Sequence, residues 1–229
     1  IGLDSVRGIG QDLAEKIVVE RRSRGPFQSI GDLSNRIGLS DRQLEALASA
    51  GAFDVLEVER RSALWAAGAA AHSGPQTLPG LEIGVTAPEL AALSPVEKTV
   101  SEIWATGISV GEYPTEHVRE QLKQSGVLSV AEVFQVEGGR RISVAGVVTH
   151  RQRPGTAKGV TFLSLEDESG MLNVVCSPGL WRRFATVARN SKSLIIRGQV
   201  ERNSGAVNLV AEHLSAFRVP AAGRSRDFR

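Results

Sequence analysis

Apolar positions in the first sixty residues recur with the spacing of amphipathic helices. One apolar stripe ends at the helix-breaking pair Gly25-Pro26, and a weaker stripe follows about thirty residues later. The stripes consist of Leu13, Ala14, Ile17 and Val18 in the first, and of Leu44, Leu47 and Ala48 in the second. A short turn precedes each stripe, Gly8-Ile9-Gly10 and then Gly38-Leu39-Ser40. The pattern predicts a tandem helix-hairpin-helix domain over residues 1–61.

The two turns have a composition suited to holding phosphate. Small residues around one apolar residue allow a tight turn whose amides face outward while the apolar side chain anchors it. Such amides beside a helix N-terminus can bind a phosphate oxygen, independently of base sequence and in a salt-sensitive manner. Ser40 and Gln43 also form a capping box. The candidate DNA contacts are Arg7, Gly8, Ile9, Gly10, Gly38, Ser40 and Arg42. A plain helical bundle or docking scaffold is the alternative.

The middle of the chain, residues 62–140, is predicted to be a linker region with short helices. Residues 62–71 are alanine-rich and helical in pattern, and residues 72–88 are rich in proline and glycine without periodicity. Ser94-Pro95-Val96-Glu97 is a strong helix start, and that helix is expected to end near Thr106. Shorter helices are expected over residues 115–124 and 129–134.

From residue 141 the periodicity changes to that of β-strands. Strands are predicted over residues 142–150, 160–166, 172–176, 194–202 and 207–213, with a helix over 178–188 between the third and fourth. This order is that of a five-stranded OB-fold β-barrel over residues 141–217. Gly146 and Gly198 lie inside strands, where a barrel often needs a bulge or sharp bend. The fold class is multidomain α plus β, ending in a basic tail over residues 218–229.

Charge is distributed unevenly and supports a polyanion partner for the barrel. Residues 141–229 carry 14 basic and 6 acidic residues, whereas residues 62–140 carry 4 and 9. A basic loop is expected after the first strand, and an OB barrel uses such a loop to track a single strand. The candidate contacts in the barrel are His150, Arg151, Arg153, Lys158, Phe162, Arg197 and Arg202. A protein-docking or purely structural barrel is the alternative.

The remaining composition argues against several functional classes. No apolar run reaches the roughly 20 residues of a membrane span, and the single cysteine cannot form an internal disulfide, so we expect a cytoplasmic protein. The densest carboxylate cluster, Glu166-Asp167-Glu168, falls at a strand end with alternate residues on opposite faces. We therefore predict no metal site, no cofactor and no catalytic residue in this chain.

Several stretches resemble the C-terminal region of bacterial C-family DNA polymerases, within the error-prone, damage-inducible branch. The resemblance spans essentially the whole chain. Residues 6–10 with 25–27, 47–54, 60–65 and 225–229 resemble the family, and the most specific stretch is residues 146–154, followed by residues 159–168. It implies a parent enzyme that performs translesion synthesis during DNA repair and the SOS response. The polymerase's catalytic aspartates and magnesium ions would lie outside this chain.

The resemblance also raises a question about partners. Replicative relatives carry a glutamine-led motif that binds the sliding clamp, but the nearest candidate, Gln76 to Leu81, is interrupted by Pro79. Clamp contact is therefore expected to be indirect, through mutasome adaptor proteins.

Three functional hypotheses follow. The first is a non-catalytic module that holds duplex DNA at the hairpins and single-stranded template at the barrel, on primed template. The second is mainly a docking module for adaptors, and the third is a free-standing accessory protein.

Overall fold

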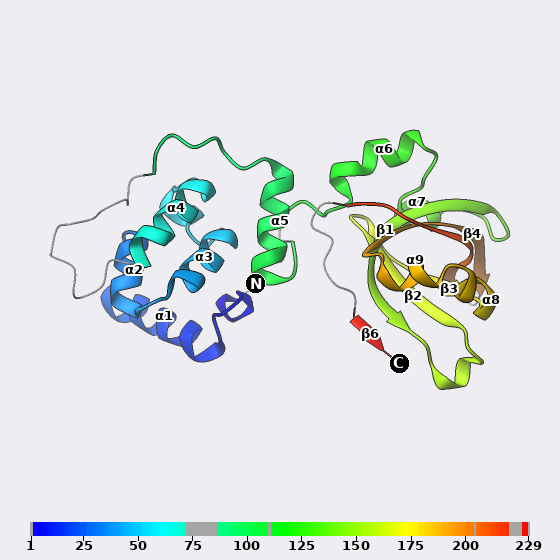
Figure 1. Ribbon diagram of the computed structural model, residues 1–229, viewed down its shortest axis with the longest axis horizontal. Coiled ribbons are helices and arrows are strands. Elements are labelled where there is room, and N and C mark those ends of the chain that lie inside the picture. The colour runs from blue at the N-terminus through cyan, green and yellow to red at the C-terminus, as the bar shows by residue number, and fades with distance from the viewer. Residues whose placement is uncertain (1, 72–86, 110, 204, 220–225, 229) are drawn as a thin grey trace. The chain divides into compact units, whose positions relative to one another are not determined.

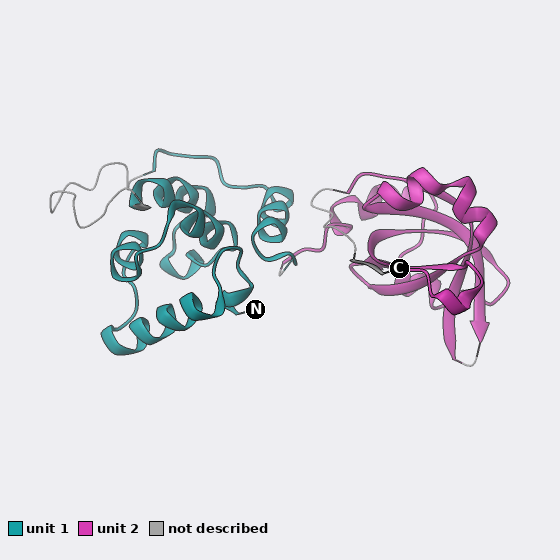
Figure 2. Cartoon of the chain, turned by 60° about the horizontal axis from the view of Figure 1, so that its bottom comes forward, with its two compact units in different colours: residues 1–109 teal, residues 110–229 magenta. Residues whose placement is uncertain are grey.

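The computed structural model describes residues 2–71, 87–109, 111–203, 205–219 and 226–228. The chain divides into two compact units, residues 1–109 and residues 110–229 (Figure 2). Each unit has its own hydrophobic core. The expected clamp-motif candidate at residues 76–81 and nearly all of the expected linker at 72–88 lie outside the described residues. Within the described parts, no helix combines the length and apolarity needed to cross a membrane.

The first unit is built from helices (Figure 1). Its elements are η1 (Leu3–Ser5), α1 (Gln11–Arg24), α2 (Ile30–Ile37), α3 (Asp41–Ser49), η2 (Asp54–Leu56), α4 (Arg60–Ala71) and α5 (Pro95–Thr106). Helix α2 was not predicted from the sequence. It begins at Ser29, whose side chain accepts a hydrogen bond from the amide of Asp32, and its buried residues recur at helical spacing.

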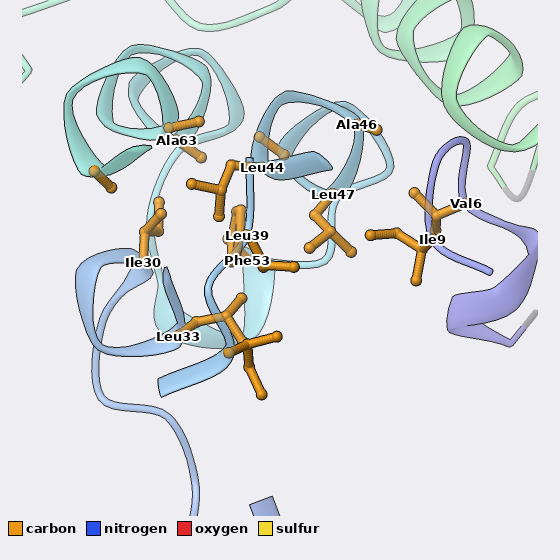
Figure 3. Close-up of a cluster of buried hydrophobic side chains, with 14 of the residues drawn as sticks. Val6, Ile9, Ile30, Leu33, Leu39, Leu44, Ala46, Leu47, Phe53 and Ala63 are labelled. Atoms are coloured by element: carbon orange, nitrogen blue, oxygen red, sulfur yellow. The ribbon is translucent and has the colours of Figure 1, made fainter. Parts of the chain in front are cut away.

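The core of this unit joins both hairpin turns to the helices that follow them. Ile9 is 1% exposed and Leu39 is 5% exposed, so each turn is anchored by its central apolar side chain. Ile9 points from the first turn toward Leu47 of α3, and Leu39, Leu44 and Phe53 gather at the centre of the same cluster (Figure 3). Burying each such side chain contributes about 1.5–3 kcal/mol. The hairpin turns are therefore fixed parts of the core.

Helices α4 and α5 belong to the same unit. Helix α4 packs on α2 and α3, and α5 packs on α3. The Arg60 guanidinium, on α4, is 8% exposed and forms ion pairs with Glu102 on α5 (2.9 Å) and with Asp54 (3.0 Å). The segment predicted as a linker with short helices, residues 62–140, is thus divided between the two units near residue 109.

The second unit is a β-barrel with helical additions. Its elements are η3 (Glu116–Val118), α6 (Arg119–Gln124), α7 (Val130–Val133), β1 (Arg141–Gln152), η4 (Gly155–Ala157), β2 (Thr161–Asp167), β3 (Gly170–Cys176), α8 (Pro178–Arg183), α9 (Ala185–Asn190), β4 (Ser193–Asn203), β5 (Ala206–Ala216) and β6 (Arg226–Phe228).

Strands β1 to β5 form a closed barrel in the expected order. The sheet runs β2-β3-β5-β4-β1, and a further β1–β2 pairing closes it. All of these neighbours are antiparallel except β3 and β5, which are parallel. Strand β6, which the sequence did not predict, pairs in parallel with the end of β1. The five-stranded OB-fold prediction is confirmed.

Two glycines let the strands of the barrel approach one another closely. A Cβ atom on Gly198 would lie 2.3 Å from the carbonyl oxygen of Val210, and one on Gly146 would lie 2.6 Å from that of Glu166. Gly198 also follows directly after a shift in the β4–β5 register. The glycines expected at bends are therefore needed for barrel closure.

Two predicted helices are broken in the structure. The helix expected over 178–188 divides at Phe184, whose backbone leaves the helical region and whose ring packs edge-on against His213 at 4.8 Å. The helix expected over 115–124 divides into η3 and α6. In the segment 178–188 the apolar pattern is continuous, and the helix is interrupted where the Phe184 ring contacts His213.

Candidate nucleic-acid interface

The two hairpin turns have matching backbones. Gly8 and Gly38 occupy the same position in their turns and have φ angles of 77° and 78°, a region that favours glycine. Both glycines are exposed, as are Gly10 and Ser40 at the start of the following helices. The predicted tandem arrangement is therefore present in the backbone as well as in the sequence.

The hairpins differ in how their helix N-termini are capped. At the second hairpin, Ser40 and Gln43 form the predicted capping box, and the Ser40 amide donates to the Gln43 side chain at 2.9 Å. At the first, Gly10 begins α1 without a side-chain cap. The Gln43 amide nitrogen also donates to the Gly8 carbonyl at 3.1 Å, which links the two turns. The first hairpin therefore leaves its first-turn amides better placed to meet an external oxygen acceptor.

The cations near the hairpins are used in two ways. Arg7 is exposed and its guanidinium lies 4.8 Å from the centre of the Trp104 ring, while Arg42 is exposed at the start of α3. By contrast, Lys16 donates to the Ile37 carbonyl at 2.7 Å, and Arg36 pairs with Glu20 at 3.0 Å. Hydrogen bonds and Coulomb attraction from its acidic partners outweigh desolvation and raise the pKa of Arg36. Lys16 is exposed as well, but its ammonium is bound to the Ile37 carbonyl, so Arg7 and Arg42 are the candidate cations better placed for an external phosphate.

The outer surface of the barrel carries one polar and one apolar row across its strands. Register places Ser164, Asn173 and Asn208 side by side on β2, β3 and β5, with His150 of β1 beside Ser164. The Asn173 amide donates to the Asn208 side-chain oxygen at 2.8 Å. This set of donors and acceptors is here called the polar row. Its member His150 was predicted from the sequence, whereas Ser164, Asn173 and Asn208 were missed. The alternation of inward and outward residues along β2 and β3 was the available signal.

The neighbouring row is apolar and contains Phe162, one of the candidate contacts. Phe162 alternates with the buried residues Thr161 and Leu163, so it lies on the outer surface and is partly exposed. Register places it beside Val175 of β3, which in turn lies beside Val210 of β5. We call these three residues the apolar row. A ring in this position can stack on a base.

The basic residues at the end of β1 and in the loop that follows it supply charge at one end of these rows, with one correction. Arg153 and Lys158 are exposed, and His150 is partly exposed. Arg151, however, is only 7% exposed, and its guanidinium donates to the carbonyls of Ala188 (2.8 Å) and Ser191. Its charge therefore stabilises the end of α9 and is not displayed on the loop surface.

The two candidate arginines on β4 also differ. Arg197 is exposed and lies opposite His213 of β5. Arg202 is exposed near the β4–β5 loop, and its guanidinium donates to the carbonyls of Val136 (2.9 Å) and Phe134. Arg202 is thus tied to the segment before β1 while its charge stays at the surface.

Two carboxylates of the cluster at the end of β2 are paired with one arginine within the unit. Arg119 of α6 forms ion pairs with Asp167 (2.8 Å) and with Glu168. Asp167 also accepts from the amide of Val130 at 2.8 Å. Burial raises the pKa of Glu168, but hydrogen bonds from Arg119 and Thr115 outweigh it, so the pKa is lowered. The cluster anchors helices to the barrel.

Comparison with known proteins agrees with this architecture. A model of the helix-hairpin-helix motif matches residues 1–63, and a model of the OB-fold nucleic acid binding domain matches residues 142–216. Fold and site therefore define a helix-hairpin-helix unit joined to an OB-fold nucleic-acid-binding domain. A structural match to asparaginyl-tRNA synthetase from Pyrococcus horikoshii covers 41% of this chain and 23% of the synthetase chain. At 23% identity and a TM-score of 0.35, it supports no conclusion about this chain.

Curated relatives are similar to this chain over all of its 229 residues. The chain is 51% identical over 229 residues to the error-prone DNA polymerase of Mycolicibacterium paratuberculosis, and 48% identical to that of Mycobacterium tuberculosis. Each match covers all of this chain and 21% of the relative. Over its whole length, the chain is similar to the C-terminal region of error-prone DNA polymerases. It spans about a fifth of the length of these curated relatives.

Proposed function

We propose that this chain holds DNA for an error-prone DNA polymerase engaged in translesion synthesis. In this proposal, the outer surface of the barrel takes single-stranded template and the first hairpin contacts duplex phosphates. In this proposal the chain binds DNA, and polymerisation belongs to the remainder of the parent protein.

One observation carries the proposal for the barrel. The polar row and the apolar row run side by side across β2, β3 and β5, and the exposed cations Arg153 and Lys158 lie in the loop between β1 and β2. Bases can stack on Phe162 and hydrogen-bond to the polar row, while the loop cations attract the phosphates. Exposed Met171 on β3 adds apolar surface beside the polar row.

The test is a fluorescence-anisotropy titration with labelled oligothymidylate. Replacing Arg153 and Lys158 together by alanine is expected to weaken binding roughly tenfold at low salt. It should also reduce the slope of log K against log salt by roughly 1.4, because two phosphate contacts are lost. Phe162→Ala is expected to cost about 1–3 kcal/mol through lost stacking, with the salt slope unchanged.

A charge-matched control separates a local contact from a general loss of charge. Arg22→Ala with Arg24→Ala removes two exposed arginines from the end of α1 and is expected to leave the titration unchanged. Arg151 is left intact, because its buried guanidinium would confuse lost stability with lost binding. Unchanged affinity and salt slope in the loop double variant would refute the barrel's proposed role.

A further inference from the structure

The first unit contains an apolar pocket apart from its hairpin turns. Its cavity has a volume of about 430 Å³ and opens between α1, the loop after α1, the end of α3 and η2. Its apolar lining includes four residues of the core, Ile17, Leu33, Leu47 and Phe53, each at most 6% exposed. The pocket therefore reaches from the surface to the centre of the unit.

The rim of the pocket presents an apolar contact and a positive charge to solvent. Val55 of η2 lines the pocket and, at 84% exposed, is the most exposed large apolar side chain among the described residues. Arg21 of α1 also lines it and is exposed. Among the described residues that form the lining, none is acidic.

We propose that this pocket binds one or two large apolar side chains from a segment of a partner protein, with acidic residues flanking those side chains. The volume is near the lower end of the roughly 300–1,000 Å³ typical of ligand pockets, which suits one or two side chains. Interfaces commonly depend on such a central anchor in a desolvated pocket with charges at the rim. The cation Arg21 selects for acidic flanks. This surface goes beyond the proposed DNA-holding function.

A protein segment fits the pocket better than a nucleic acid. The walls are aliphatic and aromatic side chains reaching into the core, whereas phosphate needs amides or several cations. Ile17 and Arg21 lie seven and eleven residues after Gly10, roughly 10 Å and 16 Å along α1 from the first hairpin. DNA at that hairpin and a peptide in the pocket can therefore be bound at different positions along one helix.

The experiment uses a labelled twelve-residue peptide with the core Trp-x-x-Leu flanked by aspartate and glutamate. Its binding is followed by fluorescence anisotropy. One control peptide replaces Trp and Leu by Ala, and another replaces the acidic residues by Lys. The acidic apolar peptide is expected to bind at least tenfold more tightly than either control. Equal binding of the lysine peptide would overturn the proposal.

Matched substitutions place the peptide in the pocket. Val55→Glu and Arg21→Glu are each expected to weaken binding at least tenfold. Val19→Glu and Arg22→Glu make the same changes at exposed positions outside the lining, and are expected to have no effect. All four sites are exposed, so folding is checked simply by circular dichroism. If Val55→Glu unfolds the unit, the comparison of Arg21→Glu with Arg22→Glu still shows whether the peptide binds at the pocket.

Two further outcomes would overturn the proposal. One is that a labelled oligonucleotide displaces the peptide and that Val55→Glu weakens oligonucleotide binding as much as peptide binding. The pocket would then be a nucleic-acid site. The other is peptide binding to this chain that disappears in a longer polymerase polypeptide containing it, which would show that the parent's own residues cover the pocket. Oligothymidylate binding, measured on the same samples, reports on the barrel separately, so failure of one proposal is distinguishable from failure of the other.

Discussion

At the scale of single residues, Glu168 shows how one carboxylate can hold a helix against the barrel. It lies just after β2, with a side chain that is 18% exposed, and accepts hydrogen bonds from Arg119 of α6 and from Thr115 (2.5 Å). Burial alone would raise the pKa of Glu168, but these donors favour the charged form and lower it. The ionised state is therefore more stable in the folded unit than in the unfolded chain.

This lowered pKa predicts a pH dependence of stability. The stabilisation is fully present above the unfolded carboxyl's pKa of roughly 4.3, and it is lost as the pH falls through the lower folded pKa. Glu168→Gln is expected to reduce the free energy of unfolding by about 1–2 kcal/mol at pH 7. The difference in free energy of unfolding between the Glu168→Gln variant and the unsubstituted chain should narrow below roughly pH 4. Urea unfolding at pH 7 and at the acidic pH measures this difference, and Glu137→Gln, at an exposed position, serves as the control. A difference that is independent of pH would contradict the role assigned to Glu168.

Residue roles were harder to predict than residue positions. The basic loop was identified from its sequence, but Arg151 turns inward to the carbonyls of Ala188 and Ser191. Because these acceptors lie 37 and 40 residues away in sequence, the local pattern could not predict this orientation. The same limit applied to Asn173 and Asn208, which meet only through the parallel β3–β5 pairing. Strand periodicity reports which face a side chain occupies, whereas its partners depend on tertiary structure.

At the scale of elements, the two hairpins share a backbone but differ at the helix start. The second is capped by Ser40 and Gln43, whereas α1 begins at Gly10 without a side-chain cap. A phosphate oxygen bound at the first hairpin would satisfy amides that an N-cap side chain normally satisfies. Duplex contact is therefore expected chiefly at the first hairpin.

Capping the first hairpin internally should separate binding from stability. Gly10 has extended backbone angles and a Cβ there would meet no atom within 4 Å, so Gly10→Asp fits without strain. The new carboxylate should cap α1, stabilise it by about 0.5–1 kcal/mol and weaken duplex binding at least several-fold by occupying the amides and repelling phosphate. Anisotropy titration with a labelled duplex measures binding, and thermal unfolding measures stability.

The control for this prediction adds the same charge at the other hairpin. Ser40→Asp retains an N-cap oxygen at an already capped helix and should change duplex binding much less. If both variants weaken binding equally, the two hairpins contribute alike and the distinction drawn from their caps is wrong.

Element boundaries were predictable where the signal was local. The capping box at Ser94 placed the start of α5 correctly, and alternation gave the strands of the barrel in order. Helix α2 was missed because it is short and enclosed between two turns, although Ser29 and its amphipathic spacing were visible. Strand β6 pairs with β1 over residues 226–228 only, and so short a strand carries too little pattern to predict.

At the scale of the whole molecule, each unit encloses a separate hydrophobic cluster. Leu47 is 1% exposed in the core of the first unit, and Leu165 is fully buried in the barrel. Each core is built only from residues of its own unit. A defect in one core should therefore destabilise the unit that contains it.

Tryptophan fluorescence can test this unit by unit, because Trp65 and Trp104 lie in the first unit and Trp181 in the second. Leu47→Ala and Leu165→Ala are each expected to cost about 2–5 kcal/mol, which shifts a urea midpoint by roughly 1–2 M. With Trp181→Phe as background, only Leu47→Ala should shift the transition, and in a chain retaining Trp181 alone only Leu165→Ala should do so. If either leucine variant shifts the unfolding transitions of both units equally, the units unfold as one cooperative structure. The surface variants proposed above would then need stability controls in both units.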